Sequence, residues 1–365
     1  MAHPFIAARR RIGAAVAVGT LAALAAALLV FARDPGRRGA PARAPIVLYT
    51  SADAEAVRPV LELFERRTGR TVRWVGDTEA TKTTGLVQRL IAERGRPRAD
   101  VWWSSEELGT TQLAAAGILA EHRFETAAAL TRELGRSGEV LQPSPRYARF
   151  APRARVIVYN TALLAPDRAP RSAAALTDPA LRGRVGIARP AFGTTRTHLA
   201  ALYAAAGPEP FRAWVRALNG AGVRLYDGNM SVVRAVASGE VYAGLTDTDD
   251  VAAGKANGWP VEALFEAPGA GGGPVPALGT ILIYNTVALV AGGPDRQGAA
   301  ALAEFLLGPE VERLLVEDSR VLALRPELAA EFPARAVPSH ALAPVRPSAA
   351  DADAALRIFE EELAR

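Results

Sequence analysis

The sequence Gly239-Glu-Val-Tyr-Ala-Gly-Leu-Thr-Asp-Thr-Asp-Asp250 joins an alternating apolar run to three carboxylates within four positions. The alternation predicts a buried strand, and the apolar run 251–256 predicts a helix after it. The acids therefore stand where a strand ends and a helix begins, the edge at which open α/β sheets bind ligands. Two interpretations remain open here: acids that cap the helix, or at least one acid that faces a ligand.

The chain on both sides of this stretch alternates strand and helix patterns. Strand patterns at 45–51, 71–75, 99–103, 155–159, 186–188, 223–226 and 261–265 alternate with helical ones, and strand patterns return at 279–284 and 287–290. Such alternation predicts parallel sheets with helices on their faces. We expect an α/β fold of two doubly wound lobes, joined by a two-strand hinge near 150–159 and 278–289. The expected lobes are 46–150, 151–280 and a return of 281–365 to the first lobe with C-terminal helices.

The basic charge of the chain is concentrated at the N-terminus. Residues 1–45 carry seven Arg and one Asp, so the rest of the chain, at +5 less +6, carries −1, which does not favour nucleic-acid binding. Arg9 to Arg11 precede the uncharged apolar run 12–31, which predicts that residues 1–32 are a signal peptide or a membrane-anchor helix, followed by a linker at 33–45. We therefore expect the body in the periplasm or on the extracellular side of the cytoplasmic membrane.

The chain contains no Cys and four His. Disulfides, thiol catalysis and Cys-based zinc or iron–sulfur sites are excluded. Neither Gly-x-Ser-x-Gly nor His-Glu-x-x-His occurs, and no catalytic residue is predicted. The segment 76–85 resembles a phosphate-binding loop but lacks the Gly before Lys82.

Polar loops follow five of the predicted strands, and their convergence is the main functional signal. They are 50–53, 76–84, 104–107, 193–197 and 246–250. The loop at Gly193, Thr194 and Thr195 opens a helix, where free amides and hydroxyls suit an anion or merely cap the helix. Asn229 opens another helix with the same two interpretations, and one acid of 104–107 is expected to cap. His198 falls inside a helix, so packing is the expected role.

Several motifs taken together resemble a known family. They are Val47-Leu-Tyr-Thr-Ser51, Phe64-Glu-Arg-Arg-Thr-Gly69, Ala99-Asp-Val-Trp-Trp-Ser-Ser-Glu106, Arg153-Ala-Arg-Val-Ile-Val-Tyr-Asn160, Gly228-Asn229, Ala243-Gly-Leu-Thr246 and Gly308-Pro-Glu-Val-Glu312. From about residue 46 to 325, the chain resembles the extracellular solute-binding proteins of ABC importers, in the branch of the ferric-iron binders. The resemblance implies a type 2 periplasmic-binding fold and a monomeric protein that delivers a solute to an inner-membrane permease. It also implies that the protein has no enzymatic activity and no cofactor.

The resemblance also implies site residues. Asp53 stands where the iron binders place a ligating His, Glu106 matches their Glu, and Asp249 and Asp250 replace their Tyr pair. These four form the predicted metal set, an all-oxygen set that suits Fe³⁺ and other hard cations and would equally pair with an organic cation. The predicted ligand-binding residues are Ser51, Asp53, Thr81, Ser105, Glu106, Gly193, Thr194, Thr195, Asn229, Asp249 and Asp250.

The predicted function is therefore an exported binding protein that captures Fe³⁺ or another small charged solute between two lobes. Two alternatives stay open at this point. One is an extracytoplasmic metal-dependent phosphoryl- or glycosyl-transfer enzyme, and the other is a ligand-sensing protein tethered through residues 12–31.

Overall fold

The computed structural model describes residues 44–77, 83–135, 141–191, 193–269, 272–338, 343 and 345–363. The predicted signal or anchor helix, nearly all of the linker, and Thr81 lie outside the described residues. Among those that are described, no helix combines the length and apolar composition needed to cross a bilayer. Residues from Pro45 onward form one unit by their contacts, and the following paragraphs describe that unit by itself.

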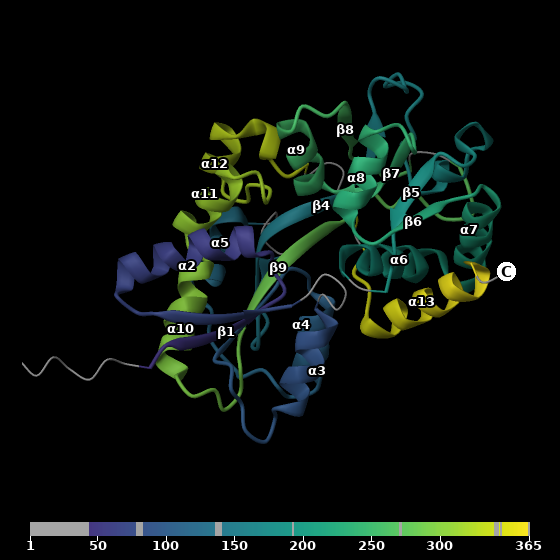
Figure 1. The fold of residues 1–365 in the computed structure, drawn as a ribbon. Coiled ribbons are helices and arrows are strands. Elements are labelled where there is room, and N and C mark those ends of the chain that lie inside the picture. The colour runs from purple at the N-terminus through teal and green to yellow at the C-terminus, as the bar shows by residue number, and fades with distance from the viewer. Residues whose placement is uncertain are drawn as a thin grey trace, which may run out of the picture. The chain divides into compact units, whose positions relative to one another are not determined.

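The first half of the sheet is built on three parallel strands. β1 (Ile46–Thr50) pairs in parallel with β2 (Val72–Gly76) and β3 (Val101–Ser104). The long β9 (Leu282–Leu289) runs antiparallel to β3, and β4 (Ala148–Asn160) runs antiparallel to β9 (Figure 1). Because the carboxyl ends of parallel strands share one edge, the loops after β1 and β3 emerge together.

The second half of the sheet continues from β4. β7 (Ala243–Asp247) runs antiparallel to β4 and parallel to β5 (Val185–Ala188), which pairs in parallel with β6 (Arg224–Tyr226). β8 (Val261–Leu264) pairs antiparallel with β4. Across the described residues the strand order is β2-β1-β3-β9-β4-β7-β5-β6, so β4 and β9 carry the chain between the halves.

Helices cover both faces of each half. Those next to the first half are α2 (Ala54–Thr68), α3 (Thr84–Ala92), α4 (Leu108–Ala115), α5 (Glu125–Leu134), α10 (Arg296–Leu306), α11 (Pro309–Glu317) and α12 (Pro326–Glu331). Those next to the second half are α6 (Gly193–Ala206), α7 (Pro208–Gly220), α8 (Asn229–Ala237), α9 (Thr248–Ala256) and α13 (Ala349–Leu363). Short 3-10 helices lie at Ala174–Thr177, Pro179–Leu181 and Pro333–Arg335.

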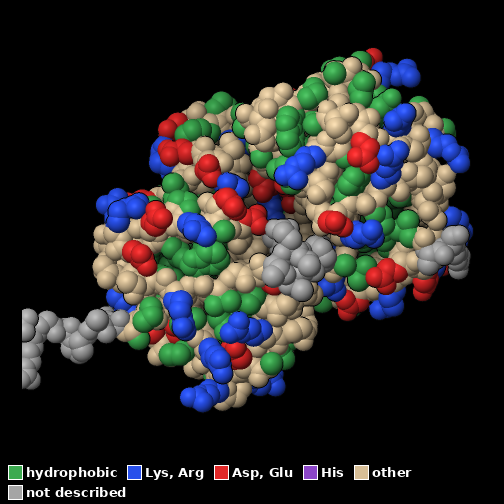
Figure 2. Space-filling model, viewed as in Figure 1, with side chains coloured by type: hydrophobic (Ala, Val, Ile, Leu, Met, Phe, Trp, Pro, Cys, Tyr) green, Lys and Arg blue, Asp and Glu red, His purple; other side chains and the backbone are tan. Residues whose placement is uncertain are grey.

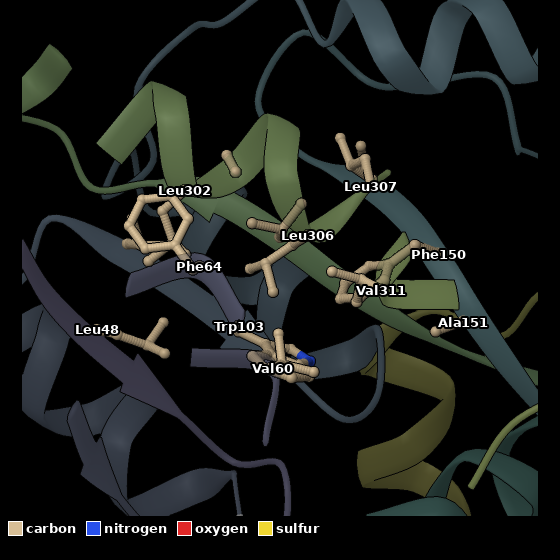
Figure 3. Packing of buried hydrophobic residues seen from close by; sticks show 14 of the residues in the cluster. Leu48, Val60, Phe64, Trp103, Phe150, Ala151, Leu302, Leu306, Leu307 and Val311 are labelled. Carbon is tan, nitrogen blue, oxygen red and sulfur yellow. The ribbon is translucent and has the colours of Figure 1, made fainter. Parts of the chain in front are cut away.

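Helix α2 shows how the pattern of the sequence builds the core. Val57, Val60 and Phe64 recur at helical spacing and are fully buried, and the helix ends at Gly69, whose φ of 66° suits a residue without a side chain. Figure 3 shows Val60 and Phe64 packed with Trp103 and the leucines of α10. Burial of each such side chain contributes on the order of 2 kcal/mol.

The second half has its own core around the α6–α7 pair. Helix α13 packs on both of these helices, and its Ala355, Ile358 and Phe359 belong to that core. Glu362 of α13 is 2% exposed and pairs with Arg212 of α7 at 2.9 Å. The expected domain division places all of 281–365 with the first half, where α10 and α11 do lie, whereas α13 packs on the second half. The difference arises because an amphipathic helix pattern says which face is apolar and not which partner covers it.

The β4–β9 crossing differs from the expected pair of short return strands. The strand β9 is continuous through Asn285 and Thr286, both buried, whereas two runs separated at these polar residues were expected. Asn285 donates from Nδ2 to the carbonyl of Ala151 at 2.7 Å and accepts from Trp103 Nε1 at 2.9 Å. Ala151 has a φ of 44°, and the β4–β9 register shifts between Phe150 and Arg153. Asn285 therefore supports the irregular part of β4 directly before Arg153.

Candidate solute-binding site

Loops from both halves meet beside β4. The β1–α2 and β3–α4 loops come from the first half, and the starts of α6, α8 and α9 come from the second. Arg153 links the two groups, because its Nη1 donates to the carbonyl of Ser105 at 2.9 Å while its Nε donates to Asp247 at 3.1 Å. Figure 2 shows acidic and basic side chains together in a hollow near the middle of the visible face.

Asp247, the last residue of β7, is the most heavily bonded carboxylate of this region. It is 2% exposed and accepts from Thr194 Oγ1 at 2.7 Å, Asn229 Nδ2 at 3.0 Å, Arg155 Nη1 at 2.8 Å and Arg153 Nε at 3.1 Å. Burial by itself would raise its pKa, but the two guanidinium groups and the Thr194 hydroxyl outweigh burial and lower the pKa below its ordinary value. Asp247 is therefore a buried, ionised group.

Asp249 lies two positions further along the chain, in the first turn of α9, and has a different environment. Burial raises its pKa to about 6, and the nearby charges of Asp247 and Asp53 add to the rise against the opposing Arg153. Arg153 Nε is 3.8 Å from its Oδ1 atom, which is buried and has no hydrogen-bond partner among the described residues. A buried carboxylate oxygen without a hydrogen-bond partner costs free energy of folding. Such unsatisfied groups are typical of ligand-binding sites.

Three of the acids lie close enough to share one cation. Asp247, Asp249 and Asp250 each offer an oxygen, and these oxygens lie within 4.8 Å of one another. Asp250 accepts from Thr246 Oγ1 at 3.3 Å. Because Asp247 already accepts four donors, Asp249 and Asp250 are the members whose geometry best suits an external cation. Asp53, an exposed residue at the start of α2, acts electrostatically on both Asp249 and Arg153.

The hydroxyls of Ser51 and Ser105 form a hydrogen bond with each other rather than with a group in the hollow. The two Oγ atoms are 3.3 Å apart, and Ser51 Oγ also accepts from the amide of Ser105 at 3.0 Å. Both residues are buried. This contact joins the β1–α2 loop to the β3–α4 loop and fixes the carbonyl of Ser105 toward Arg153.

Glu106 has partners that differ from those expected of a metal ligand. It is 3% exposed, and its carboxylate accepts from the amides of Leu108 at 2.5 Å and Gly109 at 3.0 Å. Burial raises its pKa, although those two amides and Arg196 act in the opposite direction. It also lines a small cavity of about 30 Å³ with Arg196. The first turn of α4 thus takes Glu106 as its cap, which was the alternative interpretation of this loop.

The donors at the starts of α6 and α8 face inward. Gly193 has a φ of 66°, a conformation that favours glycine, and Thr194 follows it with its hydroxyl on Asp247. Thr195 Oγ1 donates to Asn229 Oδ1 at 3.4 Å, and Asn229 Nδ2 reaches both Thr194 and Asp247. Thr194, Thr195 and Asn229 therefore lie together, around a carboxylate of the same chain.

His198 is buried, as expected of a packing residue. Burial lowers its pKa to about 3, with the neighbouring Arg155 acting in the same direction. Its Nδ1 lies 3.4 Å from Arg155 Nε, the donor of that pair. A neutral imidazole is therefore part of the support of Arg155 throughout the physiological pH range.

Two residues of this site were not assigned a role from the sequence. Arg153 and Arg155 lie two positions apart on β4, so both side chains leave the same face of the strand. Each is nearly buried, with side chains 12% and 1% exposed. Two Arg at strand spacing within an apolar run were the available signal, because buried cations require acidic partners.

Comparisons with known proteins agree on one group. A family model described as bacterial extracellular solute-binding protein matches residues 46–318. The major ferric iron-binding protein of Neisseria meningitidis is 27% identical over 205 residues, covering 56% of this chain and 59% of that protein. Iron uptake protein A1 of Synechocystis is 26% identical over 284 residues, covering 75% of this chain and 74% of its own. This chain thus spans about three fifths of the length of the Neisseria relatives it matches.

One solved structure is similar over nearly its whole length. Iron-bound HitA from Pseudomonas aeruginosa has a TM-score of 0.71, with 88% of this chain and 99% of HitA covered at 21% identity. At that identity the likeness establishes the fold alone, a mixed α/β fold of the periplasmic-binding-protein type.

Proposed function

Because this chain belongs to the bacterial extracellular solute-binding proteins, we propose that it captures a small charged solute beside β4 and delivers it to the permease of an ABC importer. Members of this family bind solutes and are not enzymes, which sets aside the transfer-enzyme alternative. The permease partner follows from the family resemblance and from the expectation that residues 1–32 export or anchor the chain.

A cation is the solute that the site supports best. The observation that carries this proposal is Asp249 Oδ1, a buried carboxylate oxygen without a hydrogen-bond partner among the described residues. Asp250 lies beside it, and the charge of Asp53, which belongs to the other half, repels the Asp249 carboxylate. Oxygen-only ligand sets favour hard cations, and relatives named for ferric iron point to Fe³⁺ as the first cation to test. An organic cation would use the same oxygens.

The candidate ligand-binding residues take two different roles in this proposal. Asp53, Asp249 and Asp250 contact the solute, whereas Ser51, Ser105 and Glu106 hold the loops of the first half in place. Thr81 belongs to the part of the β2–α3 connection outside the described residues, and its proposed contact with the solute stays as expected from the sequence.

We also propose that β4 and β9 act as the hinge. They are the strands that carry the chain between the halves, and the lobes would be 46–150 with part of 281–365 on one side and 151–280 on the other. Arg153 touches both sides, since it bonds to Ser105 and to Asp247. Rotation about these strands would open the Asp53–Asp249 gap to admit the solute and close it afterward.

A thermal-shift screen tests the proposal. Full-length protein purified without chelators would first be assayed for bound metal, then screened with Fe³⁺, Mn²⁺, Ca²⁺, polyamines and phosphonates. We expect a cation to raise Tm and phosphonates alone to leave it unchanged. A panel in which no charged solute stabilises the protein, together with no co-purified metal, would remove the support for solute capture.

A further inference from the structure

The donor residues around Asp247 form a complete oxyanion-binding arrangement. Thr194 Oγ1 and Asn229 Nδ2 lie 2.7 and 3.0 Å from Asp247 Oδ2, and Arg155 Nη1 lies 2.8 Å from Oδ1. Arg153 Nε completes the set at 3.1 Å from Oδ2. We call these four residues the Asp247 donor set. Hydroxyl and amide donors at the first turns of helices, together with guanidinium groups, are the groups that proteins use to hold oxyanions.

All four donors are directed at one internal carboxylate. The two oxygens of a carboxylate offer about four lone-pair positions, so four donors come close to saturating Asp247. Its position is fixed, because it is the last residue of β7 and is 2% exposed. An external oxyanion would have to displace this buried ionised group and separate it from both Arg153 and Arg155.

The contacts of Arg155 also indicate that the donor set holds the carboxylate of Asp247. Its side chain is 1% exposed, and its Nη1 donates to Thr194 at 3.1 Å and to Asn229 at 3.2 Å besides Asp247. Its Nη2 is buried with no hydrogen-bond partner among the described residues. A buried guanidinium in this state needs a strong anionic partner, and Asp247 supplies it at 2.8 Å.

We infer that Asp247 serves as a built-in anion: its carboxylate fills the oxyanion position of the Asp247 donor set, so that this protein takes up a cation at Asp249 and Asp250 without an accompanying anion. Asp247 is in this view a specificity-determining residue that keeps free phosphate and carboxylates out of the donor set. The inference rests on the proposed cation site only for its second clause, because occupancy of the donor set can be measured without any solute.

The experiment vacates the position and asks whether an external anion refills it. Full-length wild type, Asp247→Ala and Glu266→Ala would be compared by Tm in chloride, formate and inorganic phosphate, all at the same ionic strength of about 100 mM. Glu266 is the matched control, because it is also a buried carboxylate and accepts the amides of Ala173 and Leu278, both at 2.7 Å, away from the donor set. Formate has the size of the group that Asp247→Ala removes.

The wild type is expected to show no Tm difference between the three salts. Asp247→Ala is expected to lose on the order of 5 °C in chloride and to regain most of it in formate or phosphate. Glu266→Ala is expected to lose stability without regaining it in either anion.

Two results would overturn the inference. One is a wild-type Tm that rises in phosphate, with the rise abolished by Thr194→Ala, which would show that the donor set is open to external anions. Another is an Asp247→Ala protein that responds to formate no more than Glu266→Ala does. If Asp247→Ala does not fold in any salt, the wild-type and Thr194→Ala comparison decides alone. A cation screen that fails while formate restores Asp247→Ala would refute the proposed solute and leave the built-in anion intact.

Discussion

Replacement of Asp249 by Asn is expected to stabilise the protein at neutral pH. Burial raises the pKa of Asp249 to about 6 from an ordinary 3.8, so the folded protein holds this proton more tightly than the unfolded chain does. The favourable contribution is fully present below about pH 3.8 and is lost as pH rises through about 6. At 1.36 kcal/mol per pH unit the whole loss is about 3 kcal/mol, of which about 2 kcal/mol falls between pH 4.5 and 7.5.

Asn keeps the shape of the side chain and removes its charge, so the variant escapes this loss. The test is urea unfolding of wild type and Asp249→Asn near pH 4.5 and near pH 7.5. From the lower to the higher pH, the free energy of unfolding of Asp249→Asn should rise by about 2 kcal/mol relative to that of wild type. Asp227→Asn is the control, because the Asp227 side chain is 98% exposed, and its difference from wild type should stay constant. Equal stability differences for Asp249→Asn at both pH values would refute the reasoning that Asp249 is buried and short of partners.

Three further changes test other parts of the account. Arg155→Met should destabilise the fold by about 3–5 kcal/mol in urea unfolding, because it leaves Asp247 buried with one guanidinium fewer; a loss below about 1 kcal/mol would contradict the burial of that pair. Gly244→Ala should cost at least about 2 kcal/mol, since an added Cβ would lie 2.4 Å from the carbonyl oxygen of Gly186, whereas Gly220→Ala, with nothing within 4 Å, should be neutral or stabilising. Glu106→Gln should lower Tm, because it weakens the contacts of this side chain with the α4 amides, yet leave cation affinity within about threefold of wild type. A larger loss of affinity measured by calorimetry would show that Glu106 contacts the solute.

Local patterns predict most of the strands and helices and the acidic junction, but α5 and α12 were not predicted and β9 was expected as two runs. The apolar alternation before Thr246 and the apolar run after Asp250 predict β7 and α9, and the structure begins α9 at Thr248. Such predictions succeed because side-chain periodicity is set by the backbone geometry of each element alone. The same holds for α2, where four buried residues follow the helical period.

The partners within the site could not be predicted in the same way. Arg155 and Asp247 are 92 positions apart in the sequence, and only the antiparallel register of β4 and β7 brings them opposite each other. The sequence shows an acid and a cation but not that they satisfy one another. Glu106 illustrates the same limit, since a capping acid and a solute-binding acid have the same sequence pattern until the direction of the α4 amides is known.

Asp249 shows both what the sequence can predict and what it cannot. Its place at a strand–helix junction was predicted, and its raised pKa and unpartnered oxygen come from tertiary neighbours on β4 and α2. Residues that reduce stability in this way are expected where a protein keeps a group ready for a ligand.

Calorimetric titration of the metal-stripped, full-length protein tests the central claim most directly. Ferric ion supplied from a weak chelator would be titrated first, followed by the other cations, into wild type, Asp249→Ala and the exposed control Asp227→Ala. We expect one-to-one binding of a cation by wild type and Asp227→Ala, and an affinity weakened by roughly 100-fold, or about 2.7 kcal/mol, in Asp249→Ala. Equal affinity of wild type and Asp249→Ala for the cation that binds, or no binding of any cation, would contradict the claim.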